Sequence, residues 1–158
     1  MVELVTKEGK SPKTEFVGKS AKYILDKIGI SVGDDVKVIL METKEDHPFV
    51  QVELMMPILP LVRVPDVDQA IEMAVRVEHG NRHTAMMHSR NVEKLTKMAK
   101  LIQTTIFVKN GPSYAGIGVG GEGYTTFTIA GPTGEGLTSA KSFARRRRCV
   151  LVGGMDVR

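Results

Sequence analysis

Cysteine is almost missing from this chain, and tryptophan is missing altogether. Its 158 residues include one cysteine, Cys149, and no tryptophan. One cysteine cannot form an internal disulfide, so a secreted disulfide scaffold is excluded and a reducing compartment is expected. No apolar run approaches the ~18 residues of a membrane span, and the first ten residues lack the apolar segment of a secretory signal. We therefore expect a cytoplasmic protein with no membrane partner.

A general basic surface is also missing. The formal net charge of +4 equals the contribution of the run Arg145–Arg148 alone. This run could bind phosphate, but it has no interleaved aromatic residues and lies in an expected strand, where alternate side chains face opposite ways. We prefer the interpretation in which two of these arginines face solvent and two face carboxylates of a partner. We therefore expect no nucleic-acid partner. A small nucleic-acid binder stays open as a further hypothesis.

Strand-forming and helix-forming runs alternate along most of the chain. The expected strands cover residues 36–41, 59–64, 83–88, 104–108 and 124–129, and a final strand covers 146–152. The expected helices cover residues 19–28, 66–80, 91–102 and 137–144. Ser20, Asp66 and either Asn91 or Ser89 can cap the first three helices. Strands and helices that alternate at this spacing predict an α/β fold, a mostly parallel sheet with right-handed crossover helices.

The apolar positions predict which sides of these elements are buried. The strands 36–41 and 59–64 are continuous apolar runs, so both are expected to be mostly buried. Gly29 is expected to terminate the first helix. The inward stripes of the next two helices are expected to be Val67, Ala70, Ile71, Ala74 and Val75, and Val92, Leu95, Ala99 and Ile102.

Glycine is concentrated between two of the expected strands. Nine of the sixteen glycines lie between Gln103 and Gly136. Because glycine allows positive φ and lets the backbone approach a ligand closely, this segment predicts one wall of a binding site. Gly116–Gly121 has the letters of the dinucleotide fingerprint, but a strand is expected after it where the fingerprint needs a helix. We therefore do not assign a nucleotide to it.

The histidines and the cysteine form no recognisable metal or nucleophile motif. His79, His83 and His88 cannot share one face of an element, so structural or surface roles are preferred. Cys149 has no adjacent histidine, and an inert strand cysteine is preferred over a nucleophile. His47 precedes a proline and is expected to cap or stabilise a turn.

Glu53 is the strongest candidate for a functional side chain. It is a carboxylate within the otherwise apolar run Val50–Leu61, and charged groups are rarely placed in such surroundings without a partner. Together with the glycine segment and the Arg-rich end, Glu53-Leu54-Met55-Met56-Pro57 closely resembles the last part of CoA-acylating aldehyde dehydrogenases. The members it resembles handle acetaldehyde or propionaldehyde in ethanolamine and propanediol breakdown.

The resemblance implies a site. Glu53 would hydrogen-bond the nicotinamide ribose of NAD, in the position of the family's Glu-x-Phe-Gly-Pro pattern, and Met55 would replace the aromatic residue in a cleft that coenzyme A shares. A substrate-tunnel loop for a short aldehyde would include Phe107, Pro112, Ser113, Tyr114 and Ile117, with Ile106 as further apolar lining. The alternative is a loop that only covers the carboxyl edge of the sheet.

The resemblance also implies an organisation. Residues 1–14 have no assignment, residues 15–136 would be a partial catalytic domain, and residues 137–158 would be a helix and an oligomerisation strand. We expect a fragment of an oxidoreductase that uses NAD and CoA and forms homo-oligomers. The fragment would lack the nucleophile and the dinucleotide-binding domain, and would therefore be inactive alone. The enzyme would work in the cytoplasm, either free or inside a bacterial microcompartment. The alternative is a non-catalytic oligomerisation or scaffold module.

Overall fold

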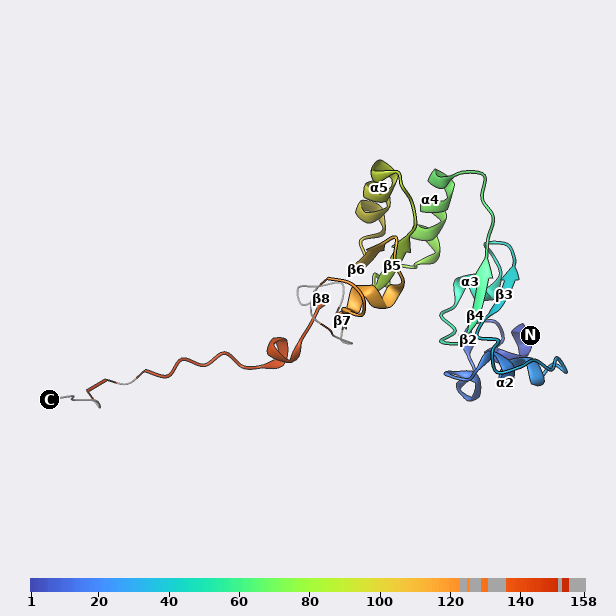
Figure 1. The fold of residues 1–158 in the computed structure, drawn as a ribbon, viewed down its shortest axis with the longest axis horizontal. Helices are drawn as coiled ribbons and strands as arrows, with labels where there is room; N and C mark the ends of the chain where they lie inside the picture. The colour runs from blue at the N-terminus through green and yellow to red at the C-terminus, as the bar shows by residue number, and fades with distance from the viewer. Residues whose placement is uncertain (123–124, 126–128, 131–135, 151, 154–158) are drawn as a thin grey trace. The chain divides into compact units, whose positions relative to one another are not determined.

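The chain forms two compact units, Met1–Gly80 and Asn81–Arg158. The computed structural model describes residues 1–122, 125, 129–130, 136–150 and 152–153. In that part of the chain, none of the helices is long and apolar enough to cross a membrane. The two units are described in turn (Figure 1).

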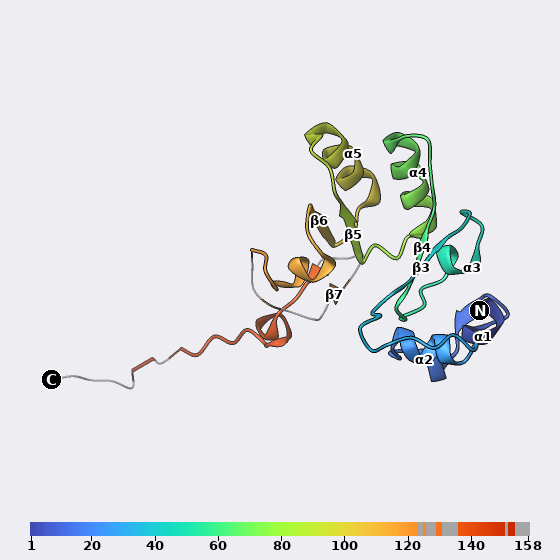
Figure 2. The ribbon, with the colours of Figure 1, turned by 45° about the vertical axis from the view of Figure 1, so that its right-hand side comes forward.

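The first unit is built around a parallel pair of strands. β3 (Ile39–Glu42) and β4 (Ile58–Leu61) pair in parallel from Ile39↔Ile58 to Glu42↔Leu61. The short helix α3 (Pro48–Gln51) lies in the connection between them. The other elements are α1 (Val2–Val5), the antiparallel strands β1 (Thr6–Lys7) and β2 (Ser11–Pro12), the 3-10 turn η1 (Thr14–Phe16), α2 (Ala21–Asp26) and α4 (Val67–Val77). Figure 2 shows α1 and α2 together near the N-terminus.

The core of this unit joins segments that lie far apart in the sequence. Its buried members are Val5, Phe16, Ile24, Phe49, Leu54 and Ile58. Val5 is completely buried, and the Lys13 amide donates to the Val5 carbonyl at 2.8 Å. Residues 1–14, which had no assignment from the sequence, therefore contribute to the core.

The β3–β4 pair is buried on one face only, which contradicts the expectation of two mostly buried strands. Leu40 and Leu59 are directly opposite each other in the register, and they are 62% and 55% exposed. Their neighbours Ile39 and Ile58 point the other way, and Ile58 lies in the core. The continuous apolar runs were misleading because successive strand residues alternate between faces.

Local capping fixes the helix ends of the first unit much as expected. The Ser20 side chain accepts from the Tyr23 amide and begins α2. Gly29, at φ +78, follows α2, and the amides of Gly29 and Ile30 donate to the carbonyls of Asp26 and Leu25. These two bonds are the Schellman arrangement that glycine favours. Asp66 caps α4 through the Gln69 amide at 2.9 Å, and Ile71 is the residue of its expected stripe that is fully buried.

The second unit repeats the strand–helix–strand plan. β5 (Thr84–Met87) and β6 (Ile106–Lys109) pair in parallel, from Thr84↔Ile106 to Met87↔Lys109, and α5 (Val92–Ile102) connects them. The remaining elements are η2 (Ser113–Ile117), the antiparallel strands β7 (Ile129–Ala130) and β8 (Gly136–Leu137), and η3 (Ala140–Phe143). The predicted α/β fold with parallel pairing is therefore confirmed.

The buried face of α5 differs in part from the expected stripe. Asn91, one of the two expected caps, begins the helix by accepting from the Lys94 amide. Leu95, Met98 and Ile102 are buried, whereas Val92 is 69% exposed. At about 3.6 residues per turn, Leu95, Met98 and Ile102 form one narrow strip along the helix, and Val92 points to one side of that strip.

The expectations for the C-terminal end are met only in part. The expected helix over 137–144 is the 3-10 turn η3, and most of the expected strand 124–129 lies outside the described residues. Arg146–Val150 forms no strand within this chain, and Val150 is 68% exposed; the oligomerisation strand expected here would pair with another chain and stays a prediction. A strand requires a neighbour for its backbone hydrogen bonds, and the described residues supply none to this segment.

Candidate functional site

The turn between α3 and β4 presents Met55 to solvent. Met55 has φ +53, an uncommon conformation for a residue with a long side chain, and is 58% exposed. The Gly18 amide donates to the Met55 carbonyl at 3.1 Å, which ties this turn to the segment that enters α2. Leu54 beside it is buried in the core. Core packing on one side and the Gly18 bond on the other thus fix the position of Met55.

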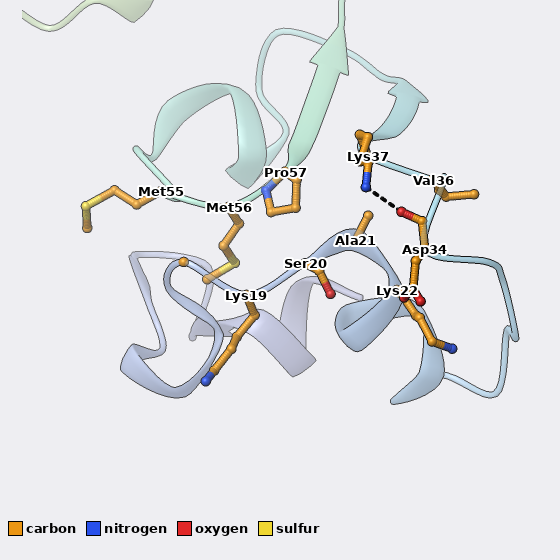
Figure 3. Close-up of a pocket in the computed structure, with 11 residues that line it drawn as sticks. Lys19, Ser20, Ala21, Lys22, Asp34, Val36, Lys37, Met55, Met56 and Pro57 are labelled. Carbon is orange, nitrogen blue, oxygen red and sulfur yellow. Dashed lines mark hydrogen bonds between the residues drawn. The ribbon is translucent and has the colours of Figure 1, made fainter.

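A pocket lies between these two segments (Figure 3). It has a volume of about 570 Å³. Three segments supply its walls: the entry to α2, the loop that precedes β3, and the turn before β4. The lining residues are Gly18, Lys19, Ser20, Ala21, Lys22, Asp34, Val36, Lys37, Met55, Met56 and Pro57. Met55, for which the family resemblance implies a cofactor contact, therefore lines an open pocket.

The charges around this pocket are mostly basic. Lys22 is paired, because its ammonium lies 3.4 Å from the Asp26 carboxylate and donates to the Val32 carbonyl at 3.2 Å. The Lys19 ammonium lies 5.6 Å from the centre of the Tyr23 ring. Lys37 donates to the backbone carbonyl of Asp34, and Figure 3 shows this bond within the cavity lining.

Glu53 lies outside the lining of this pocket. It is exposed, so its apolar neighbours in the sequence do not enclose its carboxylate, and the ligand partner expected for it stays a prediction. The physical reason is the turn itself: α3 ends at Gln51, Val52 is already extended, and Leu54 takes the inward position. An exposed carboxylate two residues from Met55 remains free to meet a ligand.

The second unit contains a separate pocket at the end of β6. Its volume is about 610 Å³, and its lining residues are Phe107, Val108, Lys109, Asn110, Gly111, Pro112, Ala115, Gly116, Gly120, Gly121 and Glu122. The structure therefore brings together two of the expected tunnel residues, Phe107 and Pro112. Ser113, Tyr114 and Ile117 lie in the adjoining η2 but do not line this pocket, and Tyr114 is 56% exposed.

Ile106, the further apolar residue of the expected tunnel, is instead buried beneath the loop. It is 5% exposed, and Gly116 packs against it so closely that a Cβ on Gly116 would overlap the Ile106 Cγ2 atom. Ile106 therefore supports the loop from behind. It does not face the pocket.

Asn110 is a site residue that the sequence reasoning missed. Its Oδ1 accepts from the Ser89 amide at 2.7 Å, and its Nδ2 donates to the Ser89 carbonyl at 3.0 Å. Asn110 has φ +56, a conformation that asparagine tolerates better than most residues. An asparagine directly after a strand and before Gly-Pro was the available signal.

The residues with capping, nucleophilic or metal-binding chemistry lie elsewhere. His47 caps α3, as expected, by accepting from the Phe49 amide at 3.1 Å. Cys149 is a free, exposed thiol, in the segment where the expected strand is absent from the described residues. Within the described ranges, no group of three or more His, Cys, Asp or Glu residues could hold a metal ion.

The sequence matches known proteins along nearly its whole length. The sequence model of the aldehyde dehydrogenase family matches residues 36–135. The chain is 52% identical over 143 residues to acetaldehyde dehydrogenase (acetylating) EutE of Salmonella typhimurium, covering 90% of this chain and 31% of that protein. It is 54% identical over 152 residues to propanal dehydrogenase (CoA-propanoylating) of the same organism, covering 96% and 32%. The chain thus spans about a third of the length of these relatives.

Solved structures of aldehyde dehydrogenases are also similar to this chain. Rhodopseudomonas palustris propionaldehyde dehydrogenase with bound CoA and an acylated cysteine has a TM-score of 0.87 and 73% identity, covering 94% of this chain and 34% of that chain. An engineered glycolyl-CoA reductase with bound NADP⁺ has the same TM-score, identity and coverage. A propionaldehyde dehydrogenase from the Clostridium phytofermentans fucose utilisation microcompartment has a TM-score of 0.83 and 51% identity, covering 98% and 35%.

Proposed function

The chain belongs to the aldehyde dehydrogenase family, and from this premise we propose that it is the cofactor- and substrate-facing part of a CoA-acylating enzyme. Such an enzyme converts a short aldehyde to an acyl-CoA with a nicotinamide cofactor, for which we propose NAD. The observation that supports this most strongly is identity above 50% to two acylating dehydrogenases over at least 90% of the chain. A cavity beside Met55 is consistent with this role.

Within this proposal the first unit serves the cofactor. Glu53 is exposed, so its carboxylate can accept hydrogen bonds from ribose hydroxyls without first breaking a bond inside the protein. Met55 presents a flexible thioether at the rim of the pocket, where it can pack against either of two ligands. The nicotinamide cofactor, when bound, supplies an acceptor for hydride.

The second unit serves the aldehyde. Phe107 and Pro112 supply apolar lining, and Ser113, Tyr114 and Ile117 continue the same loop. Side chains of this kind suit a short alkyl chain, whose burial stabilises the complex by about 0.8 kcal/mol per CH₂ group. Selectivity between acetaldehyde and propionaldehyde depends on one such group, and therefore on small differences in the volume of this pocket.

The chain alone is proposed to be inactive and to act as part of a longer protein. Covalent aldehyde oxidation requires a thiolate held near an oxyanion site. Cys149 is exposed in a segment without regular structure, directly after four arginines, and it is not among the lining residues of either pocket. NADH formation at 340 nm from propionaldehyde, NAD and CoA should be undetectable with the purified chain. Activity that disappears in Cys149→Ala would refute this part of the proposal.

A segment exchange tests the proposed function itself. In this experiment, the matching third of the Salmonella propanal dehydrogenase is exchanged for this chain, which is 54% identical to it. We expect a CoA-dependent dehydrogenase, in which Glu53→Gln raises the KM for the nicotinamide cofactor and leaves the KM for propionaldehyde unchanged. Lys44→Gln, a change at an exposed residue of the same unit outside the pocket lining, is the control. A correctly folded but inactive exchange protein would contradict the proposal.

The microcompartment relative supports a proposal on location. The Clostridium phytofermentans protein is 51% identical to this chain and comes from a bacterial microcompartment. We propose that the whole enzyme to which this chain belongs works in the cytoplasm within such a compartment. Co-purification of the full-length enzyme with shell particles would support this location, and recovery only in the free soluble fraction would contradict it.

A non-catalytic oligomerisation module is the second candidate function. One observation favours it: every sheet among the described residues has two strands, so each strand has an unpaired edge. Unpaired edges favour association with another chain. Light scattering of the purified chain should then show an oligomer, and a strict monomer would exclude this candidate.

A further inference from the structure

We infer that Asn110 and Gly111 form a site of spontaneous deamidation, and that the hydrogen bonds to Ser89 keep residue 110 in its amide form while the chain is folded. The chain has three asparagines, Asn81, Asn91 and Asn110, and only Asn110 is followed by glycine. Glycine has no Cβ to hinder the approach of its nitrogen to the side chain before it. The reaction needs only water, so it belongs to the chain itself and does not depend on the proposed function.

The reaction joins the backbone to the side chain and releases ammonia. The Gly111 nitrogen gives its proton to water or hydroxide and forms a bond to Cγ of Asn110, and the bond from Cγ to Nδ2 breaks as ammonia leaves. Water then opens the resulting cyclic imide. Hydrolysis at the side-chain carbonyl gives aspartate, and hydrolysis at the backbone carbonyl gives isoaspartate, in which the chain runs through the former side chain. No oxidant or reductant is required.

In the folded chain the attacking nitrogen is free, whereas the side chain that it attacks is held. The described residues supply no hydrogen-bond acceptor to the Gly111 amide. By contrast, both polar atoms of the Asn110 side chain bond to the backbone of Ser89. Ring closure requires this side chain to swing back over the following peptide, which breaks both bonds. The Ser89 bridge therefore controls whether the reaction can begin.

The backbone conformation of Asn110 protects the amide as well. Asn110 has φ +56, which belongs to the left-handed region, where ψ is about +30 to +60°. At such a ψ the Gly111 nitrogen is nearly anti to Cβ of Asn110, so the backbone must rotate before the ring can close. The Asn110 amide donates to the Met87 carbonyl at 3.0 Å and opposes this rotation. Deamidation in the folded chain therefore has to wait for a local opening of this turn.

Conversion would remove the bridge. An oxygen takes the place of Nδ2, the atom that donates to the Ser89 carbonyl at 3.0 Å. An ionised carboxylate only accepts hydrogen bonds, so two acceptors would face each other and repel. Asn110 also lines the pocket of the second unit, in which Lys109 and Glu122 are the charged residues, so conversion adds a second negative charge to that lining. The modification therefore loosens the start of the loop that follows β6 and changes the charge of the pocket.

Peptide mapping by mass spectrometry measures the reaction in the full chain. Samples are incubated at mildly alkaline pH with and without denaturing guanidinium chloride, and each peptide that contains asparagine is scored for the change of mass from amide to acid. We expect Asn110 to convert in the denatured chain, and roughly tenfold or more slowly in the folded chain, where the bridge must open first. Asn81 and Asn91 are internal controls that should stay unchanged, because Arg82 and Val92 follow them. No conversion of Asn110 in the denatured chain, or equal rates in both samples, would overturn the inference.

Gly111→Ala tests the chemistry apart from the fold. In guanidinium chloride the added methyl group hinders the attack of the nitrogen, so conversion of Asn110 should slow several-fold although no folded structure is present. The contact that a Cβ at this position would make with Val108 Cγ1, at 3.3 Å in the folded chain, plays no part in a denatured sample. An unchanged rate in the denatured variant would overturn the proposed attack by the Gly111 nitrogen.

Two variants test the consequence for the bridge. Asn110→Asp reproduces one product, and it should lower the midpoint of urea unfolding and shift the amide signals of Ser89 and Ala115. Asn91→Asp makes the same change at a helix cap, where Oδ1 accepts from the Lys94 amide and aspartate caps as well as asparagine, so it should keep the parent midpoint. An unchanged midpoint in Asn110→Asp, or an equal loss in both variants, would overturn the role given to the Nδ2 bond. None of these measurements uses catalytic activity, so their outcome is independent of the proposed function.

Discussion

The Asn110 side chain forms two hydrogen bonds with the backbone of Ser89, and it thereby joins the ends of two parallel strands. Its Oδ1 accepts from the Ser89 amide at 2.7 Å, and its Nδ2 donates to the Ser89 carbonyl at 3.0 Å. The Asn110 amide also donates to the Met87 carbonyl at 3.0 Å. The loop that carries Pro112, Ser113 and Tyr114 begins at the next residue, so these bonds fix where that loop starts.

Replacement of Asn110 should destabilise the second unit in a graded way. Asn110→Ala loses both side-chain bonds, each of which contributes about 0.5–1.5 kcal/mol, and places a Cβ without local hydrogen bonding at positive φ, at a cost of about 1–2 kcal/mol. Asn110→Gly loses the bonds but has no such strain, so it should be the less destabilising change. Urea unfolding measures both. Equal stability of Asn110→Ala and the parent chain would refute the role given to this side chain.

Two glycines of the same loop should respond differently to alanine. A Cβ on Gly116 would overlap Ile106 Cγ2 and lie 3.1 Å from Val108 Cγ2, and overpacking of this kind costs about 1–3 kcal/mol. A Cβ on Gly120 would meet nothing within 4 Å, although its φ of +72 adds strain. Gly116→Ala should therefore shift the amide signals of Ile106 and Val108, whereas Gly120→Ala should alter only its neighbours. Identical shift patterns would contradict this difference.

His47 should be replaceable by asparagine but not by alanine. Its Nδ1 accepts from the Phe49 amide, and loss of an N-cap side chain costs about 0.5–2 kcal/mol. His47→Asn keeps an acceptor at this position and should retain most of the stability, which serves as the control. The free energy of unfolding in urea measures the stability of both variants. An equal loss of stability in the two would show that His47 stabilises the chain by packing on Phe49, and not by its hydrogen bond.

The pair of Glu45 and Arg76 should make the stability of the first unit depend on pH. Arg76 Nε and Nη2 donate to the two Glu45 oxygens at 2.9 and 3.1 Å, and this hydrogen bond lowers the pKa of Glu45 and raises that of Arg76. Because the folded pKa of Glu45 is below 4.5, the stabilisation is present above pH 4.5 and is lost as the pH falls through the folded value.

Glu45→Gln should remove this contribution at neutral pH. The stabilities of the variant and the parent chain should therefore converge as the pH is lowered below 4.5, the ordinary pKa of the carboxyl. Thermal unfolding at several pH values measures this convergence. A constant difference between the two proteins over the whole range would show that the charge of Glu45 does not act through Arg76.

Features set by neighbouring residues could be predicted from the sequence. Ser20, Asp66 and Asn91 cap helices where expected, and Gly29 ends α2. These signals depend on a few adjacent residues and on backbone geometry, which need no knowledge of the rest of the fold.

Features that depend on distant contacts were predicted less well. Leu40 and Leu59 are exposed although their runs are apolar, and Glu53 is exposed although its neighbours are apolar. Which face of a strand is buried depends on what packs there, and a local pattern does not contain that information. The Ser89–Asn110 bridge was missed for the same reason, because its partners are 21 positions apart.

The burial of Val5 limits how far the chain can be shortened from its N-terminus. The family match begins at residue 36, so a chain trimmed to that boundary would keep Glu53 and both strands of the β3–β4 pair. It would lose Val5, Phe16 and Ile24, half of the six buried residues that form the core beneath them. Phe49, Leu54 and Ile58 would then face water in place of their partners. The N-terminal edge of the family match therefore falls inside a folding unit, and a protein shortened to that edge would lose half of the core that holds the turn of Glu53 and Met55 in place.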